Sequence, residues 1–177
     1  MKFAFGAGEK RSEGFVHHDG VAYPGIDVVH QWSPDNPLPL KDGEVDECLL
    51  ALDVLEHFSR RDVDSLVREF SRITAPGCAI IVCTIDIVRT ARWILEVPGE
   101  NLWQVEHLYC RQNFPGNRHH WAFTRVTLQD LLQRWGFIIG HFEDSKLHRG
   151  NVLAYGTRGP TGWKEFDNIA RAEGLAQ

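Results

Sequence analysis

The chain has 177 residues, a length that fits one domain, and 43% of them are hydrophobic, which is ample for one buried core. This composition excludes disordered and fibrous proteins. A formal net charge of −5 and a pI near 6.0 provide no basic field for a phosphate backbone, which argues against nucleic acid as a partner. No signal-peptide pattern precedes the first strand and no apolar stretch approaches the ~18 residues of a membrane span, so we expect no membrane partner and a cytoplasmic protein.

The N-terminal segment combines two short strands with a glycine turn. A strand over residues 3–5 runs into Gly6-Ala7-Gly8, and a second strand over residues 15–18 is followed by Asp19. Such a turn brings bare backbone to a cofactor, and an acid after the second strand is placed to accept hydrogen bonds from ribose hydroxyls. The pattern predicts an adenosine-containing ligand. Two simpler interpretations remain open, a tight turn between strands and an ordinary turn residue at position 19.

The middle of the chain predicts a strand–helix–strand unit. Residues 63, 66, 67, 70 and 73 are apolar at the spacing of one helix face, and the helix is followed by a continuous apolar strand. The segment 32–40 carries three prolines and predicts irregular structure. The elements expected here are strands over 26–30, 45–52 and 78–84, and a helix over 63–73.

The last third is less regular. We expect a helix over 88–97, no clear element over 101–125, and a helix that Thr127 caps and Gly136 ends. Strands over 137–142 and 151–157 then form an antiparallel hairpin. A final amphipathic stripe contains Trp163, Phe166, Ile169 and Ala170. It either covers a sheet face or packs on a second subunit, which leaves a homodimer open.

The order of these motifs resembles the class I S-adenosylmethionine (SAM)-dependent methyltransferases, and most of all their short, type 11-like members. The resemblance covers roughly residues 2–157 and rests on segments 5–11, 14–19, 37–40, 46–57, 68–77 and 127–137. It implies an α/β, Rossmann-like sheet in the order 3-2-1-4-5-7-6 with the last strand antiparallel. It also implies one domain over residues 1–159, followed by an amphipathic helix or tail over 160–177.

The resemblance further implies SAM as the cofactor and a small-molecule or sugar-like methyl acceptor. The residues that it places at the cofactor are Phe5, Gly6, Ala7, Gly8, His18, Asp19, Gly20, Trp32, Leu52 and Asp53. Asp53 follows the fourth strand at the edge of the expected cleft, where it is a candidate catalytic base. The alternative for Asp53 is a helix N-cap.

The chain departs from the family pattern at three places, and the mildest is Cys78, which follows Pro76-Gly77 where the family motif has a second glycine. Between Gly8 and Phe15 there is room only for a turn, where most members have the first crossover helix. After the third strand, Gln31 stands where many members have an acid. These departures motivate a second hypothesis, a catalytically silent SAM-binding or interaction subunit with the methyltransferase fold.

A histidine-rich segment follows the fifth strand. His107, Cys110, His119 and His120 are zinc-ligand types, but their spacing matches no finger pattern, so we expect no metal. We expect instead that Tyr109, His119, His120 and Trp121 line the acceptor pocket. His119 or His120 is a candidate base for a hydroxyl or amine acceptor, because imidazole titrates near neutrality.

Overall fold

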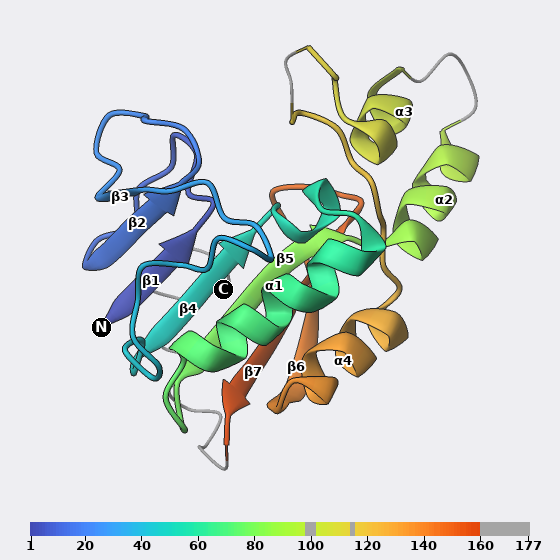
Figure 1. Cartoon of the computed structure of the whole chain (residues 1–177). Coiled ribbons are helices and arrows are strands. Elements are labelled where there is room, and N and C mark those ends of the chain that lie inside the picture. The colour runs from blue at the N-terminus through green and yellow to red at the C-terminus, as the bar shows by residue number, and fades with distance from the viewer. Residues whose placement is uncertain (98–101, 114–115, 160–177) are drawn as a thin grey trace.

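The computed structural model describes residues 1–97, 102–113 and 116–159, and its centre is a seven-stranded sheet (Figure 1). The strands lie in the order β3-β2-β1-β4-β5-β7-β6. β7 is antiparallel to both of its neighbours, and β1 to β5 pair in parallel. This confirms the predicted order and the antiparallel last strand. The strands are β1 Lys2–Phe5, β2 Phe15–Asp19, β3 Val28–Val29, β4 Cys48–Leu52, β5 Ala79–Ile85, β6 Phe137–Asp144 and β7 Asn151–Arg158.

The helices of the described residues gather on one face and beyond one edge of the sheet. α1 (Arg60–Ile73) and α4 (Arg125–Arg134) lie against one face, whereas α2 (Ile87–Glu96) and α3 (Leu102–Tyr109) lie past the carboxyl end of β5 (Figure 1). A short 3₁₀ helix, η1 (Leu55–His57), connects β4 to α1. None of the helices within the described residues is long and apolar enough to cross a membrane.

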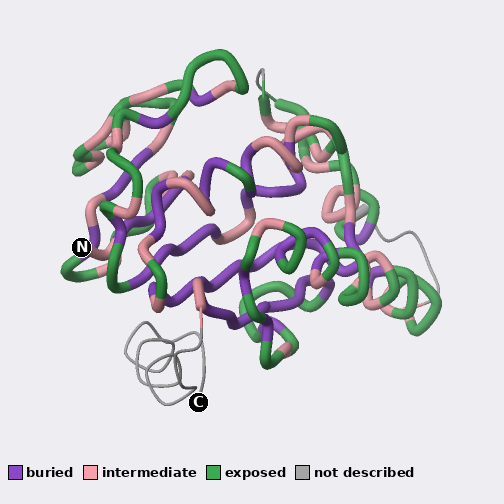
Figure 2. Tube along the Cα trace, turned by 60° about the horizontal axis from the view of Figure 1, so that its bottom comes forward, coloured by how far each residue is buried: buried purple, intermediate pink, exposed green. Residues whose placement is uncertain are grey.

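Helix α1 confirms the predicted apolar stripe. Its N-cap is Ser59, whose side chain accepts a hydrogen bond from the backbone N–H of Asp62. Its buried apolar residues are Val63, Leu66, Val67, Phe70 and Ile73, and they join the core with Phe3, Leu49 and Ile80 of the strands. In Figure 2, buried residues run through the middle of the trace and exposed residues lie mostly around it.

The connection from β1 to β2 is a turn, as predicted. Residues 6–14, all of them described, contain turns and no helix. The backbone N–H of Ala7 donates to the carbonyl of His18 at 2.9 Å, which holds the start of the turn against the end of β2. The glycine turn therefore lies directly beside the carboxyl end of the second strand.

Several predicted boundaries were wrong. β3 is two residues long because the Asp27 carboxylate accepts the backbone N–H of His17 at 2.8 Å, where a longer strand would continue the ladder. β4 begins at Cys48 rather than Val45, which forms only an isolated bridge. Residues 102–109 form a helix that the sequence pattern did not reveal. The stripe at residues 163–170 and the tail over 160–177 lie outside the described residues.

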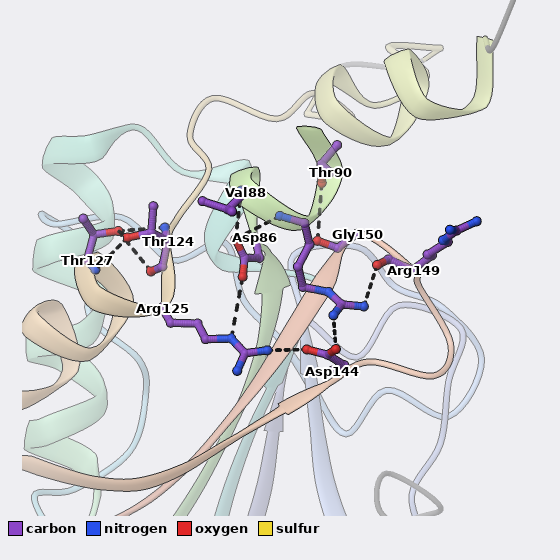
Figure 3. Close-up of polar contacts among 10 residues, drawn as sticks. Asp86, Val88, Thr90, Thr124, Arg125, Thr127, Asp144, Arg149 and Gly150 are labelled. Carbon is purple, nitrogen blue, oxygen red and sulfur yellow. Dashed lines mark hydrogen bonds and ion pairs between the residues drawn. The ribbon is translucent and has the colours of Figure 1, made fainter. Parts of the chain in front are cut away.

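The start of α4 also differs from the prediction. Its N-cap is Thr124, and Thr127 is the third helical residue, whose hydroxyl in turn accepts the backbone N–H of Thr124 at 2.9 Å (Figure 3). The two threonines form a reciprocal capping box. Thr127 belongs to the cap as predicted, but the helix begins earlier.

An ion-pair network joins α2 and α4 to the carboxyl end of the sheet (Figure 3). Buried Asp86 caps α2 by accepting the backbone N–H of Val88 at 2.9 Å, and its second oxygen lies 3.8 Å from Nε of Arg125. Asp144 at the end of β6 pairs with both Arg125 and Arg89. Because this network fixes α2 and the end of β6, it fixes the rim of the region where parallel sheets bind ligands.

Candidate functional site

A cleft of about 330 Å³ opens where β1, β2 and β4 end. It has residues from the glycine turn on one side, η1 on the other, and the segment after β3 as a wall. Eight of the ten residues predicted at the cofactor line it: Phe5, Gly6, Gly8, His18, Asp19, Gly20, Trp32 and Asp53. Ala7 and Leu52 line a smaller cavity beside it. Sequence reasoning therefore selected a spatially coherent set.

The glycine turn has a backbone that side chains would disturb. Gly6 has φ +65°, and a Cβ there would lie 2.7 Å from Cγ2 of Val54. Gly8 has φ +57° with open space around a Cβ position. Gly6 is thus required by packing and backbone together, whereas Gly8 is required by its backbone alone. The open side of Gly8 leaves its main chain accessible in the cleft.

Asp19 holds this turn in place. Its Oδ2 accepts the backbone N–H of Gly8 at 2.8 Å, and its Oδ1 accepts that of Val21 at 2.9 Å. The turn-residue interpretation is therefore correct as far as it goes. Because each carboxylate oxygen has two acceptor positions, the side chain keeps capacity for two further donors such as ribose hydroxyls.

His18 is an unusual wall of the cleft. Its ring is 1% exposed and stacks on Phe5, with 4.6 Å between centroids and 11° between planes. Among the described residues, neither ring nitrogen makes a hydrogen bond of good geometry, although an interaction with the backbone of His30 acts to raise the pKa of His18. Burial lowers its pKa to about 4, so the ring is neutral at physiological pH. Buried polar atoms of this kind are normally satisfied, so these nitrogens are candidates for ligand contact.

Asp53 lies where this cleft meets a small cavity under the β6–β7 turn. Its Oδ1 accepts a hydrogen bond from Nδ2 of Asn151 at 2.6 Å, and its Oδ2 lies 3.3 Å from Nε2 of His148. The N-cap interpretation was wrong, because the N-cap of η1 is Val54 and makes no side-chain cap bond. The φ of Asp53 is +57°, an uncommon backbone conformation that often marks functional sites in proteins.

The environment of Asp53 keeps it ionised. Burial acts to raise the pKa of Asp53, but the hydrogen bond and charge of His148, the hydrogen bond of Cys83 and the charge of Lys10 outweigh it and hold the pKa below its usual value. The same contact raises the pKa of His148. A carboxylate and an imidazole of elevated basicity therefore face each other beside the cleft.

Comparison with solved structures shows which proteins share this architecture. A SAM-dependent methyltransferase from Methanosarcina mazei matches with a TM-score of 0.55 at 14% identity, over 90% of this chain and 92% of that chain. One from Mesorhizobium loti matches with a TM-score of 0.58 at 17% identity, over 89% and 90%. The 1,6-didemethyltoxoflavin-N1-methyltransferase of Burkholderia thailandensis, with bound 1,6-didemethyltoxoflavin and S-adenosylhomocysteine, matches with a TM-score of 0.58 at 13% identity, over 90% and 71%.

The fold is that of the SAM-dependent methyltransferases. The resemblance seen in the sequence is confirmed at this level. No protein-family model and no curated protein matches the sequence, so the likeness rests on the solved structures.

In this methyltransferase fold, the predicted histidine bases lie apart from the cleft lining. Nδ1 of His119 is 2.9 Å from the carbonyl oxygen of His107, and its ring meets His57 edge-on at 4.7 Å. Burial lowers the pKa of His119 to about 4. His120 is exposed, and its backbone N–H donates to the carbonyl of Glu56 at 2.7 Å. Their catalytic role stays a prediction.

The other residues predicted at the acceptor pocket are dispersed. Tyr109 is 54% exposed, and Trp121 stacks with Arg60. Cys110 donates through its sulfur to Oδ1 of Asn117 at 2.7 Å. In the described ranges, no group of three or more His, Cys, Asp or Glu side chains is arranged to hold a metal ion.

Sequence reasoning missed His148 and Asn151. The signal that could have revealed them is topological. Because β7 runs antiparallel to β5, with Asn151 opposite Ile85, the β6–β7 turn must lie at the carboxyl edge where β4 also ends. A polar turn containing a histidine at that edge is a candidate part of the site.

Proposed function

We propose that this chain is an enzyme that binds SAM in the cleft and transfers a methyl group to a small-molecule or sugar-like acceptor. The observation that carries the proposal is that the ordered glycine turn, Asp19 and the strained Asp53 line one cleft at the carboxyl ends of the strands. The fold supports it, since the solved structures that match include one with a small molecule and S-adenosylhomocysteine bound.

The residues present fit such a cofactor. Asp19 has acceptor capacity left for ribose hydroxyls, and the open side of Gly8 allows close approach of a ligand to the main chain. We assign the apolar and stacking walls Phe5, His18 and Trp32 to the adenine ring. A bound SAM supplies a methyl group on a positively charged sulfur, which needs an aligned nucleophile.

We assign the acceptor side to Asp53 and His148. Ionised Asp53 accepts a hydrogen bond from a hydroxyl or amine and so orients it. His148 in its neutral form takes the proton, and its contact with Asp53 raises its basicity for that task. Asn151 holds the other oxygen of Asp53 and restricts its orientation. His119 and His120 stay in the proposal as further candidate bases that an acceptor would have to reach from the α3 side.

We further propose a cytoplasmic location. All four cysteines are among the described residues, and no disulfide bond joins them, which is typical of proteins in a reducing compartment. A nucleic acid partner has no support from the net charge of −5.

Incubation of the protein with SAM and a library of hydroxyl- and amine-bearing small molecules tests the activity. We expect a product heavier by one methylene unit in mass spectrometry, with formation of S-adenosylhomocysteine. The matched control is the H148A variant, which should bind SAM and form product slowly. Binding of SAM with no product from any acceptor class favours the silent subunit instead, a hypothesis that no contact in the described site specifically supports.

A further inference from the structure

The cleft that we assign to SAM has acidic residues but, among the described residues that line it, no lysine or arginine. Its acids are Asp19 and Asp53. SAM and S-adenosylhomocysteine both end in an amino-acid group, and the carboxylate of that group is an anion. An anion that leaves water for a binding site needs a counter-charge or several hydrogen-bond donors. A partner for this carboxylate must therefore come from the margin of the cleft.

The glycine turn at this margin provides no helix N-terminus for the carboxylate. Residues 6–14 are all described and contain turns without a helix. The ring of backbone N–H groups that binds anions at the start of a helix is therefore missing beside Gly8. The backbone N–H of Gly8 itself donates to Oδ2 of Asp19 at 2.8 Å. A cationic side chain is then the kind of partner that fits.

Lys10 is a cation that lies next to both the glycine turn and the end of β4. Its Nζ is 3.9 Å from Oδ2 of Asp53, and its side chain is 67% exposed. Lys10 lines the small cavity beside the glycine turn and also the cavity under the β6–β7 turn. Because an exposed ion pair of this kind contributes little, the ammonium group can contact a second anion at low cost.

The backbone around Lys10 is fixed, and the neighbouring cation is already engaged. Arg11 donates from Nη1 to the carbonyls of Gly8 and Lys10, at 2.9 and 2.6 Å, and from Nη2 to the carbonyl of Pro24. The backbone N–H of Lys10 donates to the carbonyl of Ala7 at 3.0 Å. Arg11 therefore holds the turn, whereas the side chain of Lys10 extends from a fixed backbone and can contact a ligand.

We propose that Lys10 binds the carboxylate of the SAM amino-acid chain, an inference that rests on the proposed function. The sulfur of SAM carries the ribose carbon, the methyl group and the amino-acid chain. With the ribose at Asp19 and the methyl group directed to Asp53 and His148, the amino-acid chain is left to extend along the glycine turn, where Lys10 lies. The side chain of Lys10 then provides the positive end that the missing helix would otherwise supply.

Calorimetric titration of the full-length protein with two ligands tests this inference. S-adenosylhomocysteine carries the carboxylate, and S-adenosyl-3-thiopropylamine differs from it by lacking only that group. The K10M variant removes the charge and keeps most of the length of the side chain. K146M is the matched control, because exposed Lys146 lines the cavity under the β6–β7 turn but not the one beside the glycine turn. Both substitutions change exposed side chains, and the thermal midpoint verifies that each variant is folded.

We expect K10M to bind S-adenosylhomocysteine about fivefold to tenfold more weakly than the parent, and to bind S-adenosyl-3-thiopropylamine at least as well as the parent does. K146M should equal the parent with both ligands. Unchanged affinity of K10M for S-adenosylhomocysteine, or an equal loss for both ligands, overturns the inference. A loss in K146M as large as that in K10M also overturns it, because the effect then comes from positive charge in general.

A different result would contradict the proposed function. If the folded parent protein binds neither ligand, the cleft is not a SAM site, and the assignment of Lys10 is excluded with it. Binding of S-adenosylhomocysteine by the parent, together with unchanged affinity in K10M, excludes the role of Lys10 alone and leaves the cofactor assignment standing. The two failures are therefore distinguished by the parent titration.

Discussion

Nε2 of His148 lies 3.3 Å from Oδ2 of Asp53, which joins the turn between β6 and β7 to the end of β4. The other carboxylate oxygen accepts from Asn151, so both oxygens of Asp53 are held by the β6–β7 region. The backbone N–H of Asp53, whose φ is positive, donates to the carbonyl of Cys83 at 2.9 Å. The pair joins the proposed cofactor cleft to the proposed acceptor side.

This pair predicts opposite pH shifts in two variants. Asp53 raises the pKa of His148, and the charge of Lys10 lowers it. Since the base must be neutral, the rate rises with pH through the pKa of His148. D53N should move this rising limb to lower pH and reduce the maximal rate, and K10M should move it to higher pH. Profiles of kcat/KM against pH for the parent, D53N and K10M check both shifts. If the rising limbs of the three profiles coincide, His148 is not the base.

Replacement of the three candidate histidines should separate their roles. We expect H148A to reduce kcat by about 10²-fold or more, the typical contribution of a general base. H120A should have little effect, because its side chain is exposed and lies outside the cleft lining, and H119A should mainly lower stability, because its ring packs against His57. The check is kcat and the thermal midpoint of each variant. A large loss of kcat in H120A, with kcat of H148A nearly unchanged, would mean that His120 and not His148 is the base.

Asp19 should affect both stability and cofactor binding. D19A removes the acceptor for Gly8 and Val21 and should cost about 1–3 kcal/mol of unfolding free energy. It should also weaken SAM binding by about 1.5–3 kcal/mol, the value of charge-assisted hydrogen bonds. E13A, which changes an exposed acid outside the cleft, is the control. Unchanged affinity in folded D19A would remove the ribose assignment.

The two glycines of the turn should respond differently to alanine. G6A combines a positive φ with a 2.7 Å approach to Val54, so backbone strain of about 1–2 kcal/mol adds to an overpacking cost of about 1–3 kcal/mol. G8A has the strain without the contact. Denaturant unfolding should therefore rank G6A as less stable than G8A. The reverse order would mean that the turn differs from the one described.

Because Glu56 is buried as a neutral acid, we expect the free energy of unfolding to decrease as pH rises. Burial, and then the charge of Asp53, raise its pKa to about 8, and its Oε2 accepts the hydroxyl of Thr84 at 2.8 Å. The folded state favours the neutral acid, so this stabilisation is complete below the unfolded pKa of about 4.5 and is lost as pH rises through about 8. In E56Q the unfolding free energy should fall less between these pH values. Parallel pH curves for parent and variant contradict the buried neutral acid.

Local sequence patterns predicted three features of the fold. These are the apolar stripe of α1, the continuous apolar strand β5 and the glycine turn. They could be predicted because burial selects apolar residues at a regular spacing and because a tight turn selects glycine. The length of β3 could not be predicted, because the Asp27 carboxylate accepts the backbone N–H of His17 in place of a strand-to-strand hydrogen bond. Helix α3 was not predicted because its apolar residues have no clear helical spacing. The N-cap of α4 was misplaced because Thr124 and Thr127, three residues apart, are both residue types that cap helices.

The sequence pattern selected residues that line one cleft, and it missed contacts that depend on tertiary structure. The eight predicted residues that line the cleft are close in sequence to strand ends, so topology alone brings them together. Asn151 and Asp53 are 98 residues apart, and their contact follows only from the antiparallel β7. No local pattern marks His148 as a partner of Asp53.

The most direct measurement of the central claim is a calorimetric titration of the full-length protein with S-adenosylhomocysteine, in parallel with D19A and E13A. We predict saturable binding to one site per chain, weakened in D19A and unchanged in E13A. Absence of binding by the folded parent protein, or equal binding by all three proteins, would contradict the assignment of the cleft to the SAM cofactor.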